Sequence, residues 1–185
     1  MEQILSILIG IGLSATCGFR IFVPLLGMSV AYQAGALDFA PGFAWIGTWP
    51  ATIAFAIAMV LEIAAYYIPW LDNLLDTIAT PAAVVAGTIA TASVVSDVSP
   101  FLRWTLAVIA GGGIAGLFQG ATVTIRGVST ASTGGLANPA VSTGELAASV
   151  VGTLLAILAP YIAITLVAVL LSLIIKRLTG PKAPV

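Results

Sequence analysis

Histidine is absent from this chain of 185 residues, cysteine occurs once, and charged residues make up only 7% of the sequence. Without histidine, the chain lacks the commonest metal ligand and the usual general base near neutral pH. The single cysteine, Cys17, can form neither an internal disulfide nor a thiolate cluster. We therefore expect no metal site and no cofactor. The net charge of −1 argues against nucleic acid as a partner, because nucleic-acid affinity comes largely from clustered Lys and Arg.

Charge is scarce because apolar residues replace it. Globular proteins contain about 25% charged residues, whereas 60% of this chain is hydrophobic and its mean hydropathy is +1.16. This composition predicts an all-α membrane protein, a polytopic helical bundle in a lipid bilayer. The length favours a single transmembrane domain over residues 1–185. The start, Met1-Glu2-Gln3, lacks the positive region of a signal peptide, so we expect the first apolar stretch to stay in the mature protein.

The apolar runs predict five or six spans, with broken or re-entrant segments. As one helix, residues 3–35 would run about 50 Å against a hydrocarbon core of about 30 Å, so we expect a strong tilt or a break near Cys17–Arg20. This stretch crosses the membrane once in a five-span topology and twice in a six-span one. Residues 36–49, with Trp45 and Trp49, are expected to form an interfacial loop. The other spans are expected at residues 50–66, 74–95 (interrupted at Pro81), 101–123 and 146–175.

Basic residues at the end of the chain predict its orientation. Lys176, Arg177 and Lys182 follow the last span, so the positive-inside rule places the C-terminus in the cytoplasm of a cell with this protein in its inner (plasma) membrane. Counting back over five spans puts Arg103 inside and the turn at residues 72–76 outside. That turn contains no Lys or Arg. The topology at the N-terminus stays open.

A short internal match indicates a repeat. Residues 15–20 (ATCGFR) and 121–126 (ATVTIR) share the pattern A-T-x-x-x-R, and each follows an apolar helix that contains glycine. Three spans separate the copies, so they would approach from opposite sides of the membrane, as in the inverted repeats of transporters. The possible repeat halves are residues 1–96 and 97–185. A chance match in a biased composition is the alternative.

Gly112, Gly116 and Gly120 form a stripe at four-residue spacing. Such a stripe lets helix backbones approach closely in lipid. Packing within the chain is the first interpretation, and contact with a partner helix is the second. We also expect the protein to form a homo-oligomer.

Arg20 and Arg126 are the first candidates for a functional site. An arginine at a helix centre costs about 2.5–3.5 kcal/mol on insertion, and such residues usually pair inside the bundle or face water. Two guanidinium groups at helix breaks would suit an anion or a carboxylate-bearing solute. Alternatively, each arginine reaches an interface or pairs with Glu62 or Glu145.

Three carboxylates have open roles. Glu62 is a candidate proton-coupling group or ion-pair partner, or else an interfacial carboxylate beside Tyr66 and Tyr67. Asp72 and Asp76 lie four residues apart and share a helix face, where they could bind a cation jointly or simply face water.

Residues 126–145 are rich in Gly, Ser and Thr and show no helix period. Irregular backbone of this composition can line a pore or cavity, although an ordinary external loop is the alternative. Glu145 would begin the next helix near its positive dipole end, capped by Ser142 or Thr143. The candidate solute-binding residues are therefore Arg20, Arg126, Glu62, Glu145, Thr133 and Asn138.

Three stretches, in their order along the chain, carry a family resemblance. The most specific is the third, which contains Thr-Gly-Gly-Leu-x-Asn-Pro at residues 133–139. The other two are Gly18-Phe19-Arg20 with Pro24, and Glu62 to Pro81 with Pro69, Asp72 and Asp76. Over nearly its whole length the chain resembles the bacterial membrane family catalogued as domain of unknown function 4126. That family often has an acid near Tyr66, so the tyrosine is a departure, and no acid there can be essential to this chain. The family name implies no activity.

The leading functional hypothesis is a small transporter or channel for a small polar or anionic solute. Arg20 and Arg126 would hold the solute, and residues 129–138 would line its path. The alternative is a non-transporting scaffold or assembly subunit that uses the glycine stripe, and a third hypothesis is an enzyme that acts on lipid. No Walker loop, G-x-S-x-G or H-E-x-x-H motif occurs, so no constellation indicates an enzyme.

Overall fold

The structure, a computed structural model, describes the backbone of residues 2–179 and their side chains except at 69, 70, 72, 73, 178 and 179. All regular structure in this part of the chain is helical, which confirms the all-α prediction. Five helical segments are long and apolar enough to cross a membrane. The chain is therefore a multi-pass membrane protein.

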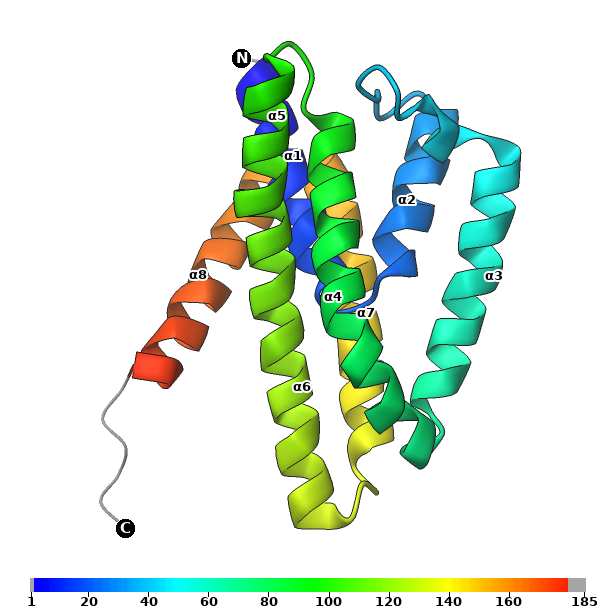
Figure 1. Cartoon of the computed structure of the whole chain (residues 1–185), viewed down its shortest axis with the longest axis vertical. Helices are drawn as coiled ribbons and strands as arrows, with labels where there is room; N and C mark the ends of the chain where they lie inside the picture. Colours follow the sequence, from blue (N-terminus) through cyan, green and yellow to red (C-terminus); the bar gives the residue numbers. More distant parts are fainter. Residues whose placement is uncertain (1, 180–185) are drawn as a thin grey trace.

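The N-terminal apolar stretch forms a re-entrant hairpin. Helix α1 (Glu2–Cys17) runs inward from one end of the bundle, and α2 (Phe22–Gln33) returns to the same end (Figure 1). Both outer ends lie near residues 93–97, because Gln3 Nε2 donates to the carbonyl of Asp97, and the amide of Ala40, in the loop after α2, donates to the carbonyl of Ser93. A single crossing by residues 3–35 is therefore wrong, and α1 and α2 are each shorter than the five candidate spans. The break near residues 17–20 is confirmed.

The chain reverses at residues 18–21, where close packing demands glycine. A Cβ on Gly18 would lie 2.5 Å from Cβ of Phe118 and 2.6 Å from the carbonyl oxygen of Ala115. Pro24 fits the first turn of α2, because an N–H at that position would have no partner within the helix. The tip of the hairpin is thus held directly against the helix that contains Phe118.

The remaining chain contains the five long helical segments, which pack side by side as a bundle (Figure 1). They are α3 (Trp49–Tyr66), α4 (Pro69–Val94), the continuous rod of α5 (Pro100–Leu106), η2 (Ala107–Gly112) and α6 (Gly113–Thr133), then α7 (Asn138–Leu158) and α8 (Pro160–Thr179). A short 3-10 helix, η1 (Ala44–Gly47), lies in the loop before α3. The predicted spans 50–66 and 74–95 are confirmed, and α4 continues through Pro81.

Two predicted spans are corrected. Residues 101–123 are only part of the rod from Pro100 to Thr133. Residues 146–175 do not form one span, because α7 and α8 meet at Ala159, whose φ of −143° and ψ of 60° interrupt the helix. Pro160 explains the interruption, since proline lacks an N–H and restricts the residue before it.

The Gly-, Ser- and Thr-rich stretch is mostly helical, so its interpretation as irregular backbone is wrong. The turn is confined to residues 134–137, where Gly134 and Gly135 have φ values of 63° and 87°. Side-chain hydroxyls are satisfied along the helix itself, as when Ser132 and Thr133 donate to the carbonyls of Val128 and Ser129. Backbone that must satisfy its own hydrogen bonds near lipid stays helical even where intrinsic propensity is poor.

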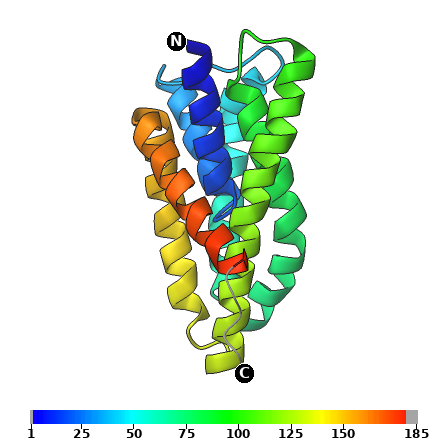
Figure 2. The same ribbon diagram turned by 90° about the vertical axis from the view of Figure 1, so that its left-hand side faces the viewer.

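Helix α1 lies at the centre of the bundle and packs through small residues (Figure 2). A Cβ on Gly10 would lie 3.1 Å from Cα of Thr91, and the hydroxyl of Ser14 donates to the carbonyl of Gly87 at 2.6 Å. Close backbone approach of this kind is how helices associate in lipid.

The predicted glycine stripe divides between two environments. Gly112 and Gly116 pack on α4, where added Cβ atoms would lie 2.6 Å from Thr88 Oγ1 and 3.0 Å from Val84 Cγ2. A Cβ on Gly120 would meet nothing within 4 Å. Packing within the chain therefore accounts for two of the three glycines.

The helix directions correct two further expectations. Helices α1 and α6 run the same way (Figure 1), so the matched segments that end at Arg20 and Arg126 do not approach from opposite sides as an inverted repeat requires. Helix α8 runs away from the end of the bundle where α5 lies, and Arg103 belongs to α5 (Figure 1). The count from the C-terminus was wrong because residues 146–175 contain a turn and belong to two helices instead of one. The cytoplasmic location of the C-terminus stays a prediction.

Candidate functional site

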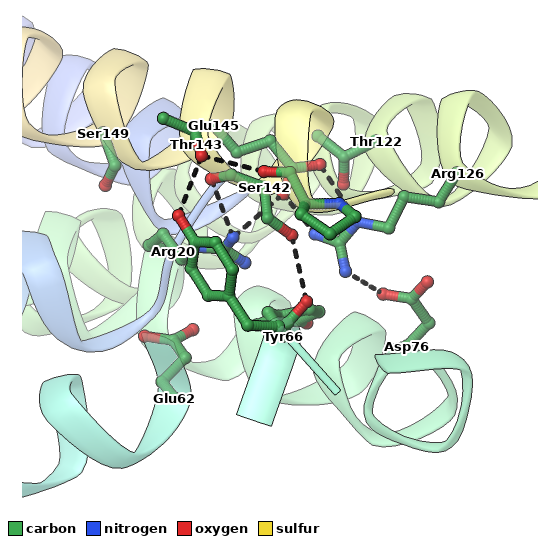
Figure 3. Close-up of polar contacts among 12 residues, drawn as sticks. Arg20, Glu62, Tyr66, Asp76, Thr122, Arg126, Ser142, Thr143, Glu145 and Ser149 are labelled. Atoms are coloured by element: carbon green, nitrogen blue, oxygen red, sulfur yellow. Dashed lines mark hydrogen bonds and ion pairs between the residues drawn. The ribbon is translucent and has the colours of Figure 1, made fainter. Parts of the chain in front are cut away.

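The structure brings Arg20 and Arg126 together at one level of the bundle. Arg126 lies about two turns before α6 ends, and Asp76 and Glu145 lie about two turns after α4 and α7 begin. Tyr66, the last residue of α3, and the hairpin tip reach the same level (Figure 3). Helix α3 is about 27 Å long, close to the hydrocarbon thickness of about 30 Å, so an apolar layer centred on α3 would end near this cluster.

Arg126 is fully engaged by carboxylates. Its Nε donates to Glu145 Oε1 at 3.2 Å, its Nη2 donates to Glu145 Oε2, and its Nη1 donates to Asp76 Oδ1 at 2.9 Å. The side chain is 1% exposed. A two-pronged arginine–carboxylate pair with a second carboxylate on the third nitrogen engages every nitrogen of the guanidinium.

Arg20 is buried equally deeply but bonded much less. Its Nη2 donates to the carbonyl of Ser142 at 3.0 Å and lies 3.3 Å from Glu145 Oε2. Its Nε and Nη1 have no hydrogen-bond partner among the described residues. Leaving a buried donor unpaired typically costs about 1–3 kcal/mol, so this guanidinium keeps unused capacity to bind an acceptor.

Tyr66 links the two arginines. The guanidinium carbons of Arg20 and Arg126 lie 4.1 Å and 4.0 Å from the centroid of its ring, and the side chain is 3% exposed. Cation–π contacts of desolvated groups contribute about 2 kcal/mol or more. The side chains of Arg20 and Arg126 point toward Glu145, and Oε2 of this carboxylate faces both guanidinium groups (Figure 3).

Glu62 caps the N-terminus of α2 from a neighbouring helix. Its Oε1 and Oε2 accept hydrogen bonds from the backbone amides of Ile21 and Phe22 at 2.9 Å and 3.1 Å. The first amides of a helix have no partner within that helix, and the helix dipole favours negative charge there. Glu62 is half-buried and, among the described residues, makes no ion pair within 4 Å.

The charges of the inner cluster balance without Glu62. Two arginines face Asp76 and Glu145, and Glu62 adds a third carboxylate at the hairpin tip. Asp76 therefore serves Arg126, and the structure does not show it joined with Asp72 at a cation site. The side chain of Asp72 lies outside the described residues. No group of three His, Cys, Asp or Glu side chains in the described part could hold a metal ion.

The other candidates lie nearer the turn between α6 and α7. Thr133 is exposed, and its hydroxyl donates to the carbonyl of Ser129. Asn138 is buried, and its amide nitrogen donates to Thr130 Oγ1 at 3.0 Å. Glu145 does not begin a helix as expected, because α7 starts seven residues earlier at Asn138.

Sequence reasoning missed Tyr66 and Ser142 as members of the cluster. Spacing carried a signal for both, because Tyr66 lies four residues after Glu62 and Ser142 lies three residues before Glu145, so each pair shares a helix face. Tyr66 was interpreted only as an interfacial aromatic and Ser142 only as a helix cap. The two residues are only 3% and 0% exposed, and the spacing of residues in the sequence cannot reveal such burial.

An apolar cavity adjoins the cluster between α2, α3 and α4. Its volume is about 430 Å³. The lining residues are Ile21, Phe22, Ala58, Leu61, Glu62, Ala65, Tyr66, Leu75, Ile78, Ala79 and Ala82. Leu61 and Ile78 are 63% and 61% exposed, so the cavity opens at the outer face of the bundle.

A family model described as Domain of unknown function (DUF4126) matches residues 7–179. The match includes every residue of the cluster and confirms the resemblance carried by the sequence. Neither the search of curated proteins nor the search of solved structures gave a match.

Proposed function

The chain belongs to the family described as Domain of unknown function (DUF4126), and from that premise we propose that it is a small membrane transporter for a small polar or anionic solute bound at Arg20. The family description assigns no activity, so the proposal rests on the geometry of this chain. A channel would use the same site.

One observation carries the proposal. Arg20 is 1% exposed, and two of its nitrogens have no partner among the described residues. Intramembrane charges are costly and usually mark solute or ion paths, and an anion would supply the missing acceptors. The group lies at the tip of a broken, re-entrant segment, a feature of many transporter binding sites.

The two arginines have different roles in this proposal. Arg126 has no free nitrogen, because Glu145 and Asp76 engage all three. It holds α4, α6 and α7 together and orients Glu145 toward Arg20. The proposed solute site therefore contains one arginine, Arg20, instead of the two that the sequence suggested.

The path would begin at the end of the bundle formed by the α6–α7 turn. Residues 129–138 border that entrance, and the hairpin tip separates the cluster from the other end (Figure 1). Helix α3 would move most easily, because Tyr66 is its only buried side chain. We assign this end to the cytoplasm of an inner (plasma) membrane, because α8 runs toward it and carries Lys176 and Arg177 in its last turn.

Flux measurements test the proposal. Purified protein in liposomes would be assayed for movement of chloride, inorganic phosphate, acetate and hexanoate. We expect flux of at least one of these anions, reduced at least tenfold by Arg20→Gln. The matched control is Arg177→Gln, which removes the same charge at the exposed end of α8. Absence of flux for every anion, or equal flux in the Arg20→Gln variant, would contradict the proposal.

A non-transporting assembly subunit is the second candidate. Gly113, Gly120 and Gly127 lie seven residues apart on α6, and a Cβ on any of them would meet nothing within 4 Å. This open face suits a close helix contact with a second copy of the chain, as a homo-oligomer requires, or with another subunit. Loss of a stoichiometric partner on Gly120→Leu would support it. Gly116→Leu is unsuitable, because Gly116 packs on α4.

A further inference from the structure

We infer that Glu62 occupies a carboxylate site at the N-terminus of α2, next to Arg20, and that an amphipathic monocarboxylate displaces it. Calling this ligand the transported solute rests on the proposed function. The binding site itself does not.

The ligand class comes from what the site already holds. Glu62 places both carboxylate oxygens on the amides of Ile21 and Phe22 at 2.9 Å and 3.1 Å. Helix N-termini bind carboxylates and phosphates through these groups. Because Glu62 belongs to α3, the α2 site is filled by a tethered group from another helix, which a free carboxylate can imitate.

Arg20 supplies the second, independent observation. It directly precedes Ile21, is 1% exposed and keeps Nε and Nη1 without a partner in the described part of the chain. Its guanidinium lies over the ring of Tyr66, and Tyr66 and Glu62 both line the apolar cavity. The helix N-terminus and the cavity therefore meet at Glu62, and Arg20 lies beside the cavity-lining ring of Tyr66.

The cavity determines the rest of the ligand. Its lining is apolar except at Glu62 and Tyr66, so a carboxylate bound at that end would direct a hydrocarbon chain toward Ala58 and Ala82. The head group would lie near the boundary of the apolar layer and the chain within it, as amphiphiles orient in a bilayer. A dianion is disfavoured, because Glu145 already places negative charge beside Arg20.

Exchange requires Glu62 to leave, and α3 allows it. Only Tyr66 among the side chains of α3 is buried, whereas seven residues of α1 are buried. A site that is occupied by its own tethered ligand for nine-tenths of the time binds a free ligand about tenfold more weakly than an open site. Glu62 therefore sets the apparent affinity.

Hexanoate binding to the purified, full-length protein tests the inference, with titration calorimetry as the readout. Glu62→Gln removes the competing charge, and Glu62→Asp keeps the charge but is too short to bond both amides. We expect both variants to bind hexanoate about tenfold more tightly than the unaltered chain. Glu2→Gln, which removes an exposed acid far from the site, is the matched control and should change nothing.

Each alternative outcome is decisive. Unchanged or weaker binding in both folded variants overturns the inference. Tighter binding in Glu62→Gln alone also overturns it, because relief of charge repulsion would then explain the effect without displacement. Hexanol, which has the same chain without the carboxylate, should not bind, and acetate should bind more weakly than hexanoate.

A second pair of variants keeps the inference testable if the Glu62 variants do not fold. Ala58 lines the cavity, whereas Ala54, one turn earlier on α3, is exposed and does not. Ala58→Phe should weaken hexanoate binding at least tenfold, and Ala54→Phe should leave it unchanged. Equal effects of the two variants, or no effect of either, would contradict a chain seated in this cavity.

Failure of this inference is distinguishable from failure of the proposed function. Arg20-dependent flux without a gain of affinity in the Glu62 variants would leave transport standing and remove Glu62 as a competitor. Tighter hexanoate binding in those variants without any flux would leave the carboxylate site standing and remove transport.

Discussion

Arg20 and Arg126 share the ring of Tyr66 and one oxygen of Glu145, yet their surroundings differ. Arg126 lies within a continuous helix, and carboxylates engage all its nitrogens. Arg20 lies where the chain reverses, with two nitrogens unpartnered in the described structure. Burial alone therefore does not separate a structural arginine from a binding one. What separates them is whether every nitrogen of the buried guanidinium has a hydrogen-bond partner.

The largest effect on stability should come from replacing Arg126, whose three nitrogens are all hydrogen-bonded. Arg126→Gln leaves Glu145 and Asp76 without their main partner, and breaking a buried ion pair from one side costs about 3–5 kcal/mol. We expect a loss of that size in the free energy of unfolding, measured by denaturant titration in detergent. Arg177→Gln, at an exposed position, is the control. A loss below about 1 kcal/mol, the range of exposed pairs, would show that Arg126 does not anchor the helices.

The hairpin tip should be the next most sensitive position. Gly18→Ala forces a Cβ against Phe118 and the carbonyl of Ala115, and overpacking of this kind costs about 1–3 kcal/mol. We expect a value near the upper end, because backbone cannot move aside as a side chain can. Gly120→Ala, where a Cβ meets nothing within 4 Å, should be neutral in the same unfolding measurement. Equal effects would mean that the tip is not held as described.

Replacing Tyr66, whose ring contacts both arginines, should lower the stability by a smaller amount. Tyr66→Leu removes the ring that faces both guanidinium groups, and we expect a loss of about 2 kcal/mol. Tyr66→Phe keeps the ring, so it should retain most of the stability. A Phe variant as unstable as the Leu variant would assign the contribution of Tyr66 to its hydroxyl.

The smallest change in stability should follow Arg20→Gln. The substitution removes one carbonyl bond, one 3.3 Å ion contact and the contact with the ring of Tyr66, but it also removes two unpartnered donors, and these effects offset each other. Glu145 keeps Arg126 as its partner. The free energy of unfolding should therefore change by about 1 kcal/mol or less. A loss of stability as large as that of Arg126→Gln would contradict the distinction between Arg20 and Arg126.

Sequence alone was sufficient for the membrane class and for the candidates Arg20, Arg126 and Glu145, because unpaired charge is too costly in lipid to occur without a reason. It also located the break at residues 17–20 from glycine and the following Pro24. It could not show whether the broken stretch crosses the membrane or turns back. That outcome depends on the contacts of Gly18 with Phe118 and Ala115, which lie about a hundred residues away in the chain.

Composition misled the interpretation of residues 126–145. Gly, Ser and Thr weaken an isolated helix, but hydroxyls that bond to carbonyls three or four residues earlier are satisfied within one, as for Ser132 and Thr133. The capping role of Glu62 was equally hidden, because Ile21 and Phe22 lie forty residues earlier and on another helix. Only packing brings them together.

The most direct test is the thermal stability of the Arg20→Gln variant with and without hexanoate. A ligand at a hundred times its dissociation constant stabilises the folded state by about 2.7 kcal/mol, so hexanoate should raise the Tm of the unaltered chain and of Arg177→Gln. It should not raise the Tm of Arg20→Gln. An equal rise in all three proteins, or no rise in any, would contradict the assignment of Arg20 as the residue that binds the anion.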